Sequence, residues 1–115
     1  MNRSVLFIAV LCGVLYGALS VQLAQAEELP TFQVVAKNGH FEPTKMEVPA
    51  GKRIKIVVKN EGPGPEEFES ADLRIEKVIA AGASSFVVIN NLKPGTYRFI
   101  GEFHAETAKL DVIAK

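Results

Sequence analysis

The stretch RIKIVVKN, residues 53–60, indicates the fold class of this chain. Ile54, Ile56 and Val58 alternate with arginine or lysine, which is typical of a strand that buries one face and exposes the other. Turn signals such as Asn38-Gly39 and KPG (residues 93–95) separate it from similar runs. The other predicted strands include TFQVVAK (31–37), KMEV (45–48), SSFVVINNL (84–92), TYRFIGEF (96–103) and KLDVIAK (109–115).

Short strands at this spacing predict an all-β Greek-key sandwich of about seven to eight strands, in two antiparallel-rich sheets. In TYRFIGEF, we expect Tyr97, Phe99, Gly101 and Phe103 on one side of the strand. Residues 61–67, EGPGPEE, read as a loop because two prolines and two glycines interrupt regular structure. Residues 68–82 fit a short helix or an irregular strand equally well, so at most one short helix is expected, around residues 70–80.

Residues 1–26 differ in composition from the rest of the chain. Arg3 precedes an apolar run from Val5 to Leu19, and Ala24-Gln25-Ala26 follows. This is the pattern of a cleaved secretory signal peptide; a retained anchor is the alternative, although the run is short for a span of about 20 residues. We expect export to the periplasm and a domain at 27–115. Cys12, the only cysteine, would leave with the signal, so the exported domain would have no thiol.

The charge balance and motif content exclude several function classes. Thirteen basic and thirteen acidic residues give no electrostatic reason to bind nucleic acid. There is no G-x-S-x-G, no P-loop and no plausible Ser/His/Asp set, so no catalytic residue is assigned. The polar residues that stand out are acidic, at residues 66–69, at 76 and at 102–106.

Several motifs together resemble the cupredoxin fold. They are F-x-P (41–43), VPAGKRIKIVVKN (48–60), a Gly/Pro loop, and LKPGTYRF (92–99) before a histidine. More narrowly, PEEFESADLRIEKVI (65–79) and LKPGTYRFIGEFHAETA (92–108) resemble the EfeO-type cupredoxin-like family. This family includes stand-alone FtrB-like periplasmic components of bacterial ferrous-iron uptake. The resemblance implies two partners, an inner-membrane iron permease and a second periplasmic metal-binding protein.

The sequence departs from the cupredoxin pattern at the copper ligands. A blue-copper site uses two histidines, a cysteine thiolate and a weak axial methionine. By the resemblance, Glu66-Glu67 stand where the first histidine is expected, Gly101 replaces the cysteine, and no methionine lies near Lys109. Only His104 matches a ligand. We therefore expect no blue-copper centre.

Carboxylates and imidazole suit harder or borderline ions, namely Fe, Mn, Zn or Cu(II). Together with the resemblance, this makes an iron or copper ion the expected cofactor. Glu67 and Glu69 share one strand face, with Phe68 between them directed to the core. Glu102 and His104 are expected to have the same relation around Phe103. These two pairs give the predicted metal ligands Glu67, Glu69, Glu102 and His104.

Four further residues form a second tier of candidate ligands. Glu76 either pairs with Arg74 or Lys77 or reaches the cluster, and the sequence leaves this open. His40 precedes an inward Phe41 and should face solvent. Glu66 and Glu106 read more simply as solvated carboxylates, and Met46 as a core residue. The second-tier candidates are Glu76, Glu106, His40 and Glu66.

Three functions remain open at the level of sequence. The first is a periplasmic metal-binding accessory protein of ferrous-iron uptake, which passes an ion or an electron to a permease complex. The second is an enzyme that oxidises Fe(II) with copper or iron. The third is a metal-free docking module, since a fold does not fix a function. A homodimer is also left open.

Overall fold

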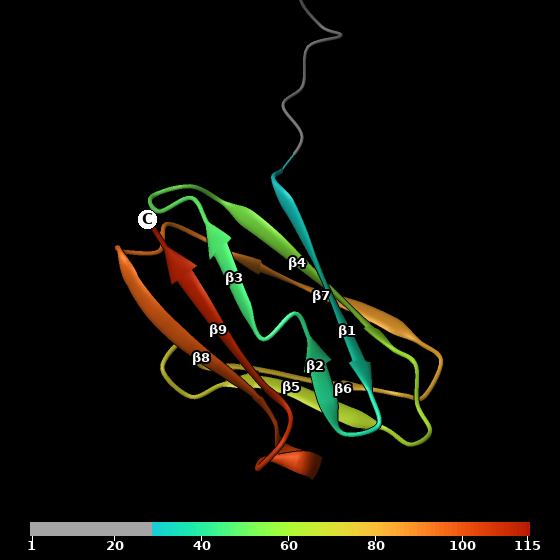
Figure 1. Cartoon of the computed structure of the whole chain (residues 1–115). Helices are drawn as coiled ribbons and strands as arrows, with labels where there is room; N and C mark the ends of the chain where they lie inside the picture. The colour runs from blue at the N-terminus through green and yellow to red at the C-terminus, as the bar shows by residue number, and fades with distance from the viewer. Residues whose placement is uncertain (1–28) are drawn as a thin grey trace, which may run out of the picture.

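A computed structural model describes residues 29–115; the expected signal peptide and Cys12 lie outside the described residues. The described residues form nine strands in two facing sheets (Figure 1), which confirms the predicted all-β sandwich. In chain order the elements are β1 (Thr31–Lys37), β2 (His40–Glu42), β3 (Lys45–Val48), β4 (Ile54–Asn60), β5 (Glu66–Ser70), β6 (Ile75–Ile79), β7 (Ser84–Ile89), β8 (Gly95–Gly101), the 3-10 helix η1 (Glu102–His104) and β9 (Lys109–Ala114).

The two sheets have mixed topology. The four-stranded sheet has the order β2-β1-β4-β7, and the five-stranded sheet the order β3-β9-β8-β5-β6. Strand β1 runs parallel to β4, and β3 runs parallel to β9, whereas every other pair is antiparallel. The short segment β2–β3 therefore carries the chain from the edge of one sheet to the edge of the other.

The core lies between the inner faces of the two sheets. Ile54, Ile56 and Val58 of β4 are at most 1% exposed, as their alternation predicts. Phe68 of β5 stacks on Phe99 of β8 with ring centroids 4.5 Å apart, and Phe41 meets Phe68 edge-on at 5.5 Å. All three rings belong to the buried core cluster.

The ambiguous segment after β5 is a strand and not a helix. A tight turn with Arg74 at φ 55° leads into β6, which pairs antiparallel with β5 along its whole length. The hydrophobic pattern of this segment was ambiguous because β6 is an edge strand whose middle residues are exposed. Val78, an apolar residue, is 64% exposed. The apolar residues of β6 therefore do not follow a two-residue period.

The penultimate strand is shorter than expected. Strand β8 ends at Gly101, and Phe103, expected on the same side of the strand as Phe99, lies in η1 and is 51% exposed. The chain turns here because the N–H of Gly101 donates to Ala108 O and the N–H of Ala108 donates to His104 O. Strand β5 begins earlier than expected, at Glu66, so two residues assigned to the loop belong to the sheet.

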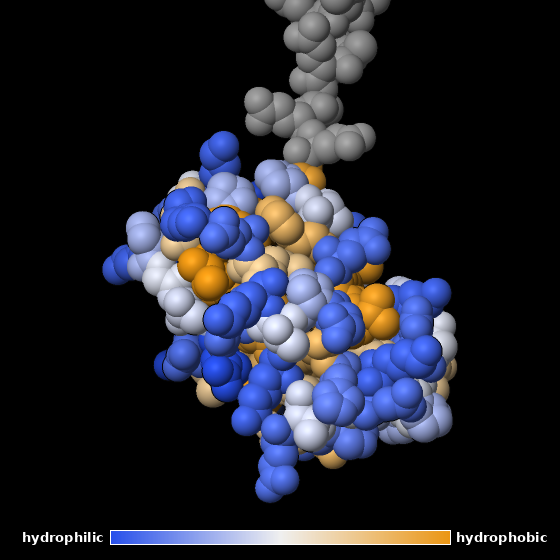
Figure 2. Space-filling model, in the orientation of Figure 1, coloured by the Kyte–Doolittle hydropathy of each residue, from blue (hydrophilic) through white to orange (hydrophobic). Residues whose placement is uncertain are grey.

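The surface is mainly hydrophilic on the face that Figure 2 shows, and hydrophobic residues there are interspersed with charged and polar ones. Within residues 29–115, no helix has the length and apolar character needed to cross a membrane.

Candidate functional site

Strand β5 places carboxylates on both of its sides. Glu66 and Phe68 alternate with Glu67 and Glu69, and Phe68 is fully buried between the sheets. Glu66 is therefore directed toward the end of the core, while Glu67 and Glu69 lie on the outer face of the five-stranded sheet. This alternation creates two separate groups of polar residues.

The outer group, here called the carboxylate cluster, contains Glu67, Glu69, Glu76 and Glu102. One carboxylate oxygen from each residue lies within 4.8 Å of the others. Glu69 and Glu76 are directly opposite each other on β5 and β6, and Glu102 joins them from η1. Like charges directly opposite on paired strands are destabilising, so this arrangement favours a bound proton or cation.

Glu67 is the buried member of the carboxylate cluster. It is only 4% exposed, and its Oε1 has no hydrogen-bond partner in the described part of the chain. The surrounding carboxyl groups donate a hydrogen bond only when they are protonated. Contact with the Glu76 carboxyl, burial, and then contact with Glu69 and Glu102 raise the pKa of Glu67 from 4.5 to about 8. With a pKa of about 8, this carboxyl group keeps its proton at neutral pH unless a bound cation takes the proton's place.

This raised pKa predicts how the stability of the metal-free protein depends on pH. Between pH 4.5 and about 8 the folded state binds more protons at Glu67 than the unfolded state, so stability should fall as pH rises through this window. Thermal unfolding in chelator at pH 5 to 8.5 measures the slope. We expect Glu67→Gln to flatten it, since the variant has no proton to lose there. An equal slope in both proteins would contradict this assignment.

The titration of Asp111 does not interfere with that measurement of stability against pH. Its pKa is lowered, mainly by the hydrogen bond from Arg98, and burial partly opposes the shift. The stability that Asp111 contributes is present above its ordinary pKa of 3.8 and is lost only as pH falls below that value. This effect lies outside the Glu67 window and has the opposite sign.

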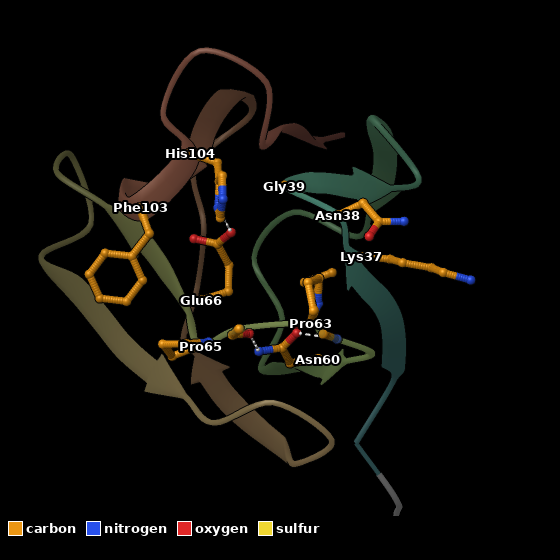
Figure 3. Close-up of a pocket in the computed structure, with 12 residues that line it drawn as sticks. Lys37, Asn38, Gly39, Asn60, Pro63, Pro65, Glu66, Phe103 and His104 are labelled. Carbon is orange, nitrogen blue, oxygen red and sulfur yellow. Dashed lines mark hydrogen bonds and ion pairs between the residues drawn. The ribbon is translucent and has the colours of Figure 1, made fainter.

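The inner group is a pair formed by Glu66 and His104. His104 Nδ1 lies 2.6 Å from Glu66 Oε2, and Glu66 Oε1 accepts the N–H of Glu67 at 3.0 Å. Figure 3 shows the two side chains pointing toward each other across one end of the sandwich. Glu66 is thus a buried partner of the histidine, and its interpretation as a solvated carboxylate is wrong.

The structure divides the four predicted ligands between the two groups. Glu67, Glu69 and Glu102 lie together, but Glu76 completes the cluster and His104 is paired with Glu66. The expected shared face of Glu102 and His104 is wrong because both lie in a 3-10 helix, where residues two apart point in different directions. The second-tier residues His40 and Glu106 are exposed and belong to neither group, and Met46 is buried in the core.

Gly101 shows whether a blue-copper centre fits this sandwich. A Cβ atom at residue 101 would lie 2.7 Å from Glu66 Oε1 and 2.8 Å from Ala108 Cβ. Glu66 therefore occupies the space that a cysteine side chain would need. Cys12 lies outside the described residues and Met46 is in the core, so residues 29–115 do not fit a thiolate–methionine copper site.

The fold and the ligand-like groups at one end of the sandwich define a cupredoxin-like module. The chain belongs to the cupredoxin-like domain family, whose model matches residues 6–114. A Rickettsia prowazekii (strain Madrid E) protein, uncharacterized protein RP394, is 36% identical over 77 residues, which cover 67% of this chain. Those residues span 62% of the length of that relative.

Solved structures with the same fold have low sequence identity to this chain. Auracyanin A, a "blue" copper protein from Chloroflexus aurantiacus, has a TM-score of 0.66 at 14% identity, covering 76% of this chain and all of that one. A second such structure is the metal-binding domain of the Streptococcus pneumoniae D39 Cu(I)-exporting P-type ATPase CopA, solved with Cu(I). It has a TM-score of 0.66 at 12% identity, covering 80% of this chain and 91% of that one. At these identities the likeness establishes the fold alone.

Proposed function

We propose that this domain binds a hard cation at the carboxylate cluster of Glu67, Glu69, Glu76 and Glu102. The observation that carries the proposal is Glu67 Oε1, which is buried and has no hydrogen-bond partner in residues 29–115. A buried carboxylate without a partner is strongly destabilising unless a proton or a cation neutralises it. Three further carboxylates within 4.8 Å supply the oxygen ligands that a cation at this position requires.

Iron is the ion that we propose for the cluster, with copper(II) as the alternative. Carboxylate oxygens suit hard ions and stabilise Fe(III) relative to Fe(II), whereas the soft sulfur ligands of a blue-copper site are missing. Two segments that carry the EfeO-type resemblance, residues 65–79 and 92–108, supply all four carboxylates. The copper in the structural relatives is bound by those proteins, and it supports metal handling as a general use of this fold.

The resemblance also supplies the proposed cellular role. In this role the domain is an exported, periplasmic component of ferrous-iron uptake. It receives the ion and passes the ion or an electron to an inner-membrane permease, together with a second periplasmic metal-binding protein. Binding and transfer, and not turnover, are the proposed activity, because the cluster is a set of carboxylate oxygens that can hold an ion.

Calorimetric titration tests the ion-binding proposal directly. We expect Mn(II), as a mimic of Fe(II), and Fe(II) under nitrogen to bind with one ion per domain and a Kd of about 1 μM or tighter. The Glu69→Gln/Glu102→Gln variant should lose this binding because it removes two of four charged ligands. Glu47→Gln is the matched control, since Glu47 is exposed and pairs with Lys115.

The titration also has an outcome that would overturn the proposal. If no ion produced heat or changed the melting temperature of the wild-type protein, the cluster would not be a cation site. The sandwich would then be better explained as a docking module for another protein.

A further inference from the structure

Charge is distributed unevenly between the two sheets, although the whole sequence has 13 basic and 13 acidic residues. Of the carboxylates in the nine strands, only Glu42 of β2 belongs to the four-stranded sheet, and it lies at the edge. The same sheet contains Lys37, Lys55 and Lys59. The balanced net charge therefore conceals one sheet whose strands are mainly basic and one whose strands hold most of the carboxylates.

The lysines of the four-stranded sheet lie on its outer face, together with apolar side chains. Alternate residues of β4 are buried in the core, so Lys55, Val57 and Lys59 are directed outward. Residues directly opposite on paired strands share a face, which places Phe86 beside Val57 and Val35 beside Lys59. This face, here called the basic face, thus combines an apolar centre with lysines on either side of it.

Neither lysine of β4 is neutralised by a carboxylate in the described part of the chain. Lys55 and Lys59 form no ion pair within residues 29–115, whereas Lys37, at one end of the basic face, lies 4.0 Å from Glu61. Phe86 is 52% exposed, and Lys55 Nζ lies 4.4 Å from the centroid of its ring. A lysine over an aromatic ring keeps its charge at the surface while its methylene chain covers apolar neighbours.

A membrane surface that contains anionic lipids has the chemistry that complements the basic face. Lipid phosphates attract lysines close to the surface, and an exposed aromatic ring inserts at the boundary between headgroups and acyl chains. The order of the chain favours a membrane over an acidic protein. Strand β1 of this sheet begins at Thr31, shortly after the apolar run that ends at Leu19 and that we expect to direct export, so the domain is released beside a membrane.

We infer that the basic face, with Lys55, Lys59 and Phe86 at its centre, docks on a membrane surface rich in anionic lipid. The inference goes beyond the proposed function because it involves neither the carboxylate cluster nor an ion. The outer faces of the two sheets point in opposite directions (Figure 1), and the carboxylate cluster lies on the other sheet. A domain docked in this way therefore holds the cluster on the side away from the lipid, open to solution.

Co-sedimentation of the purified protein with lipid vesicles tests the docking. One set of vesicles is pure phosphatidylcholine, and the other is an equimolar mixture of phosphatidylcholine and anionic phosphatidylglycerol. We expect binding to the mixed vesicles that weakens as salt is added, and much weaker binding to pure phosphatidylcholine. A chelator is present throughout, because it removes cations that would bridge the carboxylate cluster to lipid phosphate.

Paired lysine substitutions assign the binding to one sheet. Lys55→Gln/Lys59→Gln should weaken binding to the mixed vesicles about 10–30-fold, since each lysine near an anionic surface adds to the attraction. Lys45→Gln/Lys109→Gln is the matched control, because it removes the same charge from exposed positions on the outer face of the five-stranded sheet. This control should change the binding far less.

A second pair of variants tests the apolar part of the basic face. Phe86→Ser should weaken binding to the mixed vesicles about 3–10-fold, because the ring no longer inserts among the lipids. Phe103→Ser removes a ring of similar exposure, 51%, from η1 and should bind the vesicles like the wild type. Thermal unfolding of each variant should remain cooperative, which shows that a loss of binding is not a loss of fold.

Several outcomes would overturn the inference. The wild type would bind no mixed vesicles, or the two lysine pairs would lose binding equally, or Phe86→Ser and Lys55→Gln/Lys59→Gln would both bind like the wild type. If the wild type bound poly-L-glutamate but no vesicles, the basic face would be a docking surface for an acidic protein, and the inference would be wrong.

The carboxylate-cluster variant separates this inference from the proposed function. We expect Glu69→Gln/Glu102→Gln to lose Mn(II) binding and to bind the mixed vesicles like the wild type. If the wild type bound no ion in calorimetry but bound the mixed vesicles through Lys55 and Lys59, the proposed function would fail and this inference would stand. If it bound Mn(II) but no vesicles, the inference would fail and the proposed function would stand.

Discussion

Replacing Gly101 by alanine is expected to lower the free energy of unfolding by about 1–3 kcal/mol, the range for overpacking a well-packed core. The backbone is not the reason, because Gly101 has an extended conformation, φ −93° and ψ 105°, that any residue adopts. The reason is space: a Cβ atom there would lie under 3 Å from both Glu66 and Ala108. Cysteine should be at least as destabilising, so a thiol is not restored at this position by one substitution.

Chemical denaturation of Gly101→Ala beside Gly64→Ala measures this effect. A Cβ atom at Gly64 would meet no other atom within 4 Å, and Gly64 has no positive φ, so alanine there should be neutral or stabilising by about 0.4–1 kcal/mol. A Gly101→Ala/Glu66→Ala double variant should recover part of the loss, since one of the two clashing groups is removed. Wild-type stability of Gly101→Ala would show that Glu66 does not occupy this space.

Glu67→Gln is expected to weaken Mn(II) binding by at least about 30-fold, which corresponds to about 2 kcal/mol. This is the lower end of the range for removing one partner of a buried charge interaction. Glu67 is the buried member of the carboxylate cluster and the one with an oxygen that lacks a partner in the described part of the chain. Glutamine has the same shape, so the loss would reflect charge and not packing. The same variant should unfold at a higher temperature than the wild type at pH 8.5 in chelator, because no carboxylate has to be buried there.

Glu47→Gln again provides the comparison for a loss of charge at an exposed position. It should change neither the Mn(II) affinity nor the melting temperature by a measurable amount, because exposed ion pairs contribute little. If Glu67→Gln bound Mn(II) as tightly as Glu47→Gln, the unpaired oxygen would have no role in binding an ion. The carboxylate cluster would then require another explanation.

Strands were predictable from the sequence where apolar and polar residues alternate along the whole strand. Strand β4 has three aliphatic residues, Ile54, Ile56 and Val58, that alternate with polar or less buried positions, and its bounds match the predicted run closely. Strand β6 was not predictable because edge strands bury little, and Val78 faces solvent in spite of its apolar side chain. The early end of β8 was also missed, since a turn at Gly101 depends on hydrogen bonds to residues 104–108 that no local pattern reveals.

The candidate site was predictable only in part, because some of its contacts join residues from different strands and turns. Glu67 and Glu69 are two apart in a strand, so the sequence alone places them on one face. Glu76 joins them because β5 and β6 form a hairpin in which Glu69 and Glu76 are directly opposite. Recognising that hairpin would have identified Glu76. The contact between Glu66 and His104 joins residues 38 apart in the sequence, and only the three-dimensional structure reveals it.

The pairing of β3 with β9 has a consequence for how the domain folds. Residues 45–48 lie beside residues 111–114, and β9 is an inner strand of its sheet, with Leu110 and Val112 fully buried. The five-stranded sheet is therefore incomplete until the ninth strand has been synthesised. Chains dominated by such distant pairings fold in milliseconds to seconds, more slowly than helical domains of equal size. We therefore expect the five-stranded sheet to close late in folding, after the four-stranded sheet of β2, β1, β4 and β7, which does not require β9.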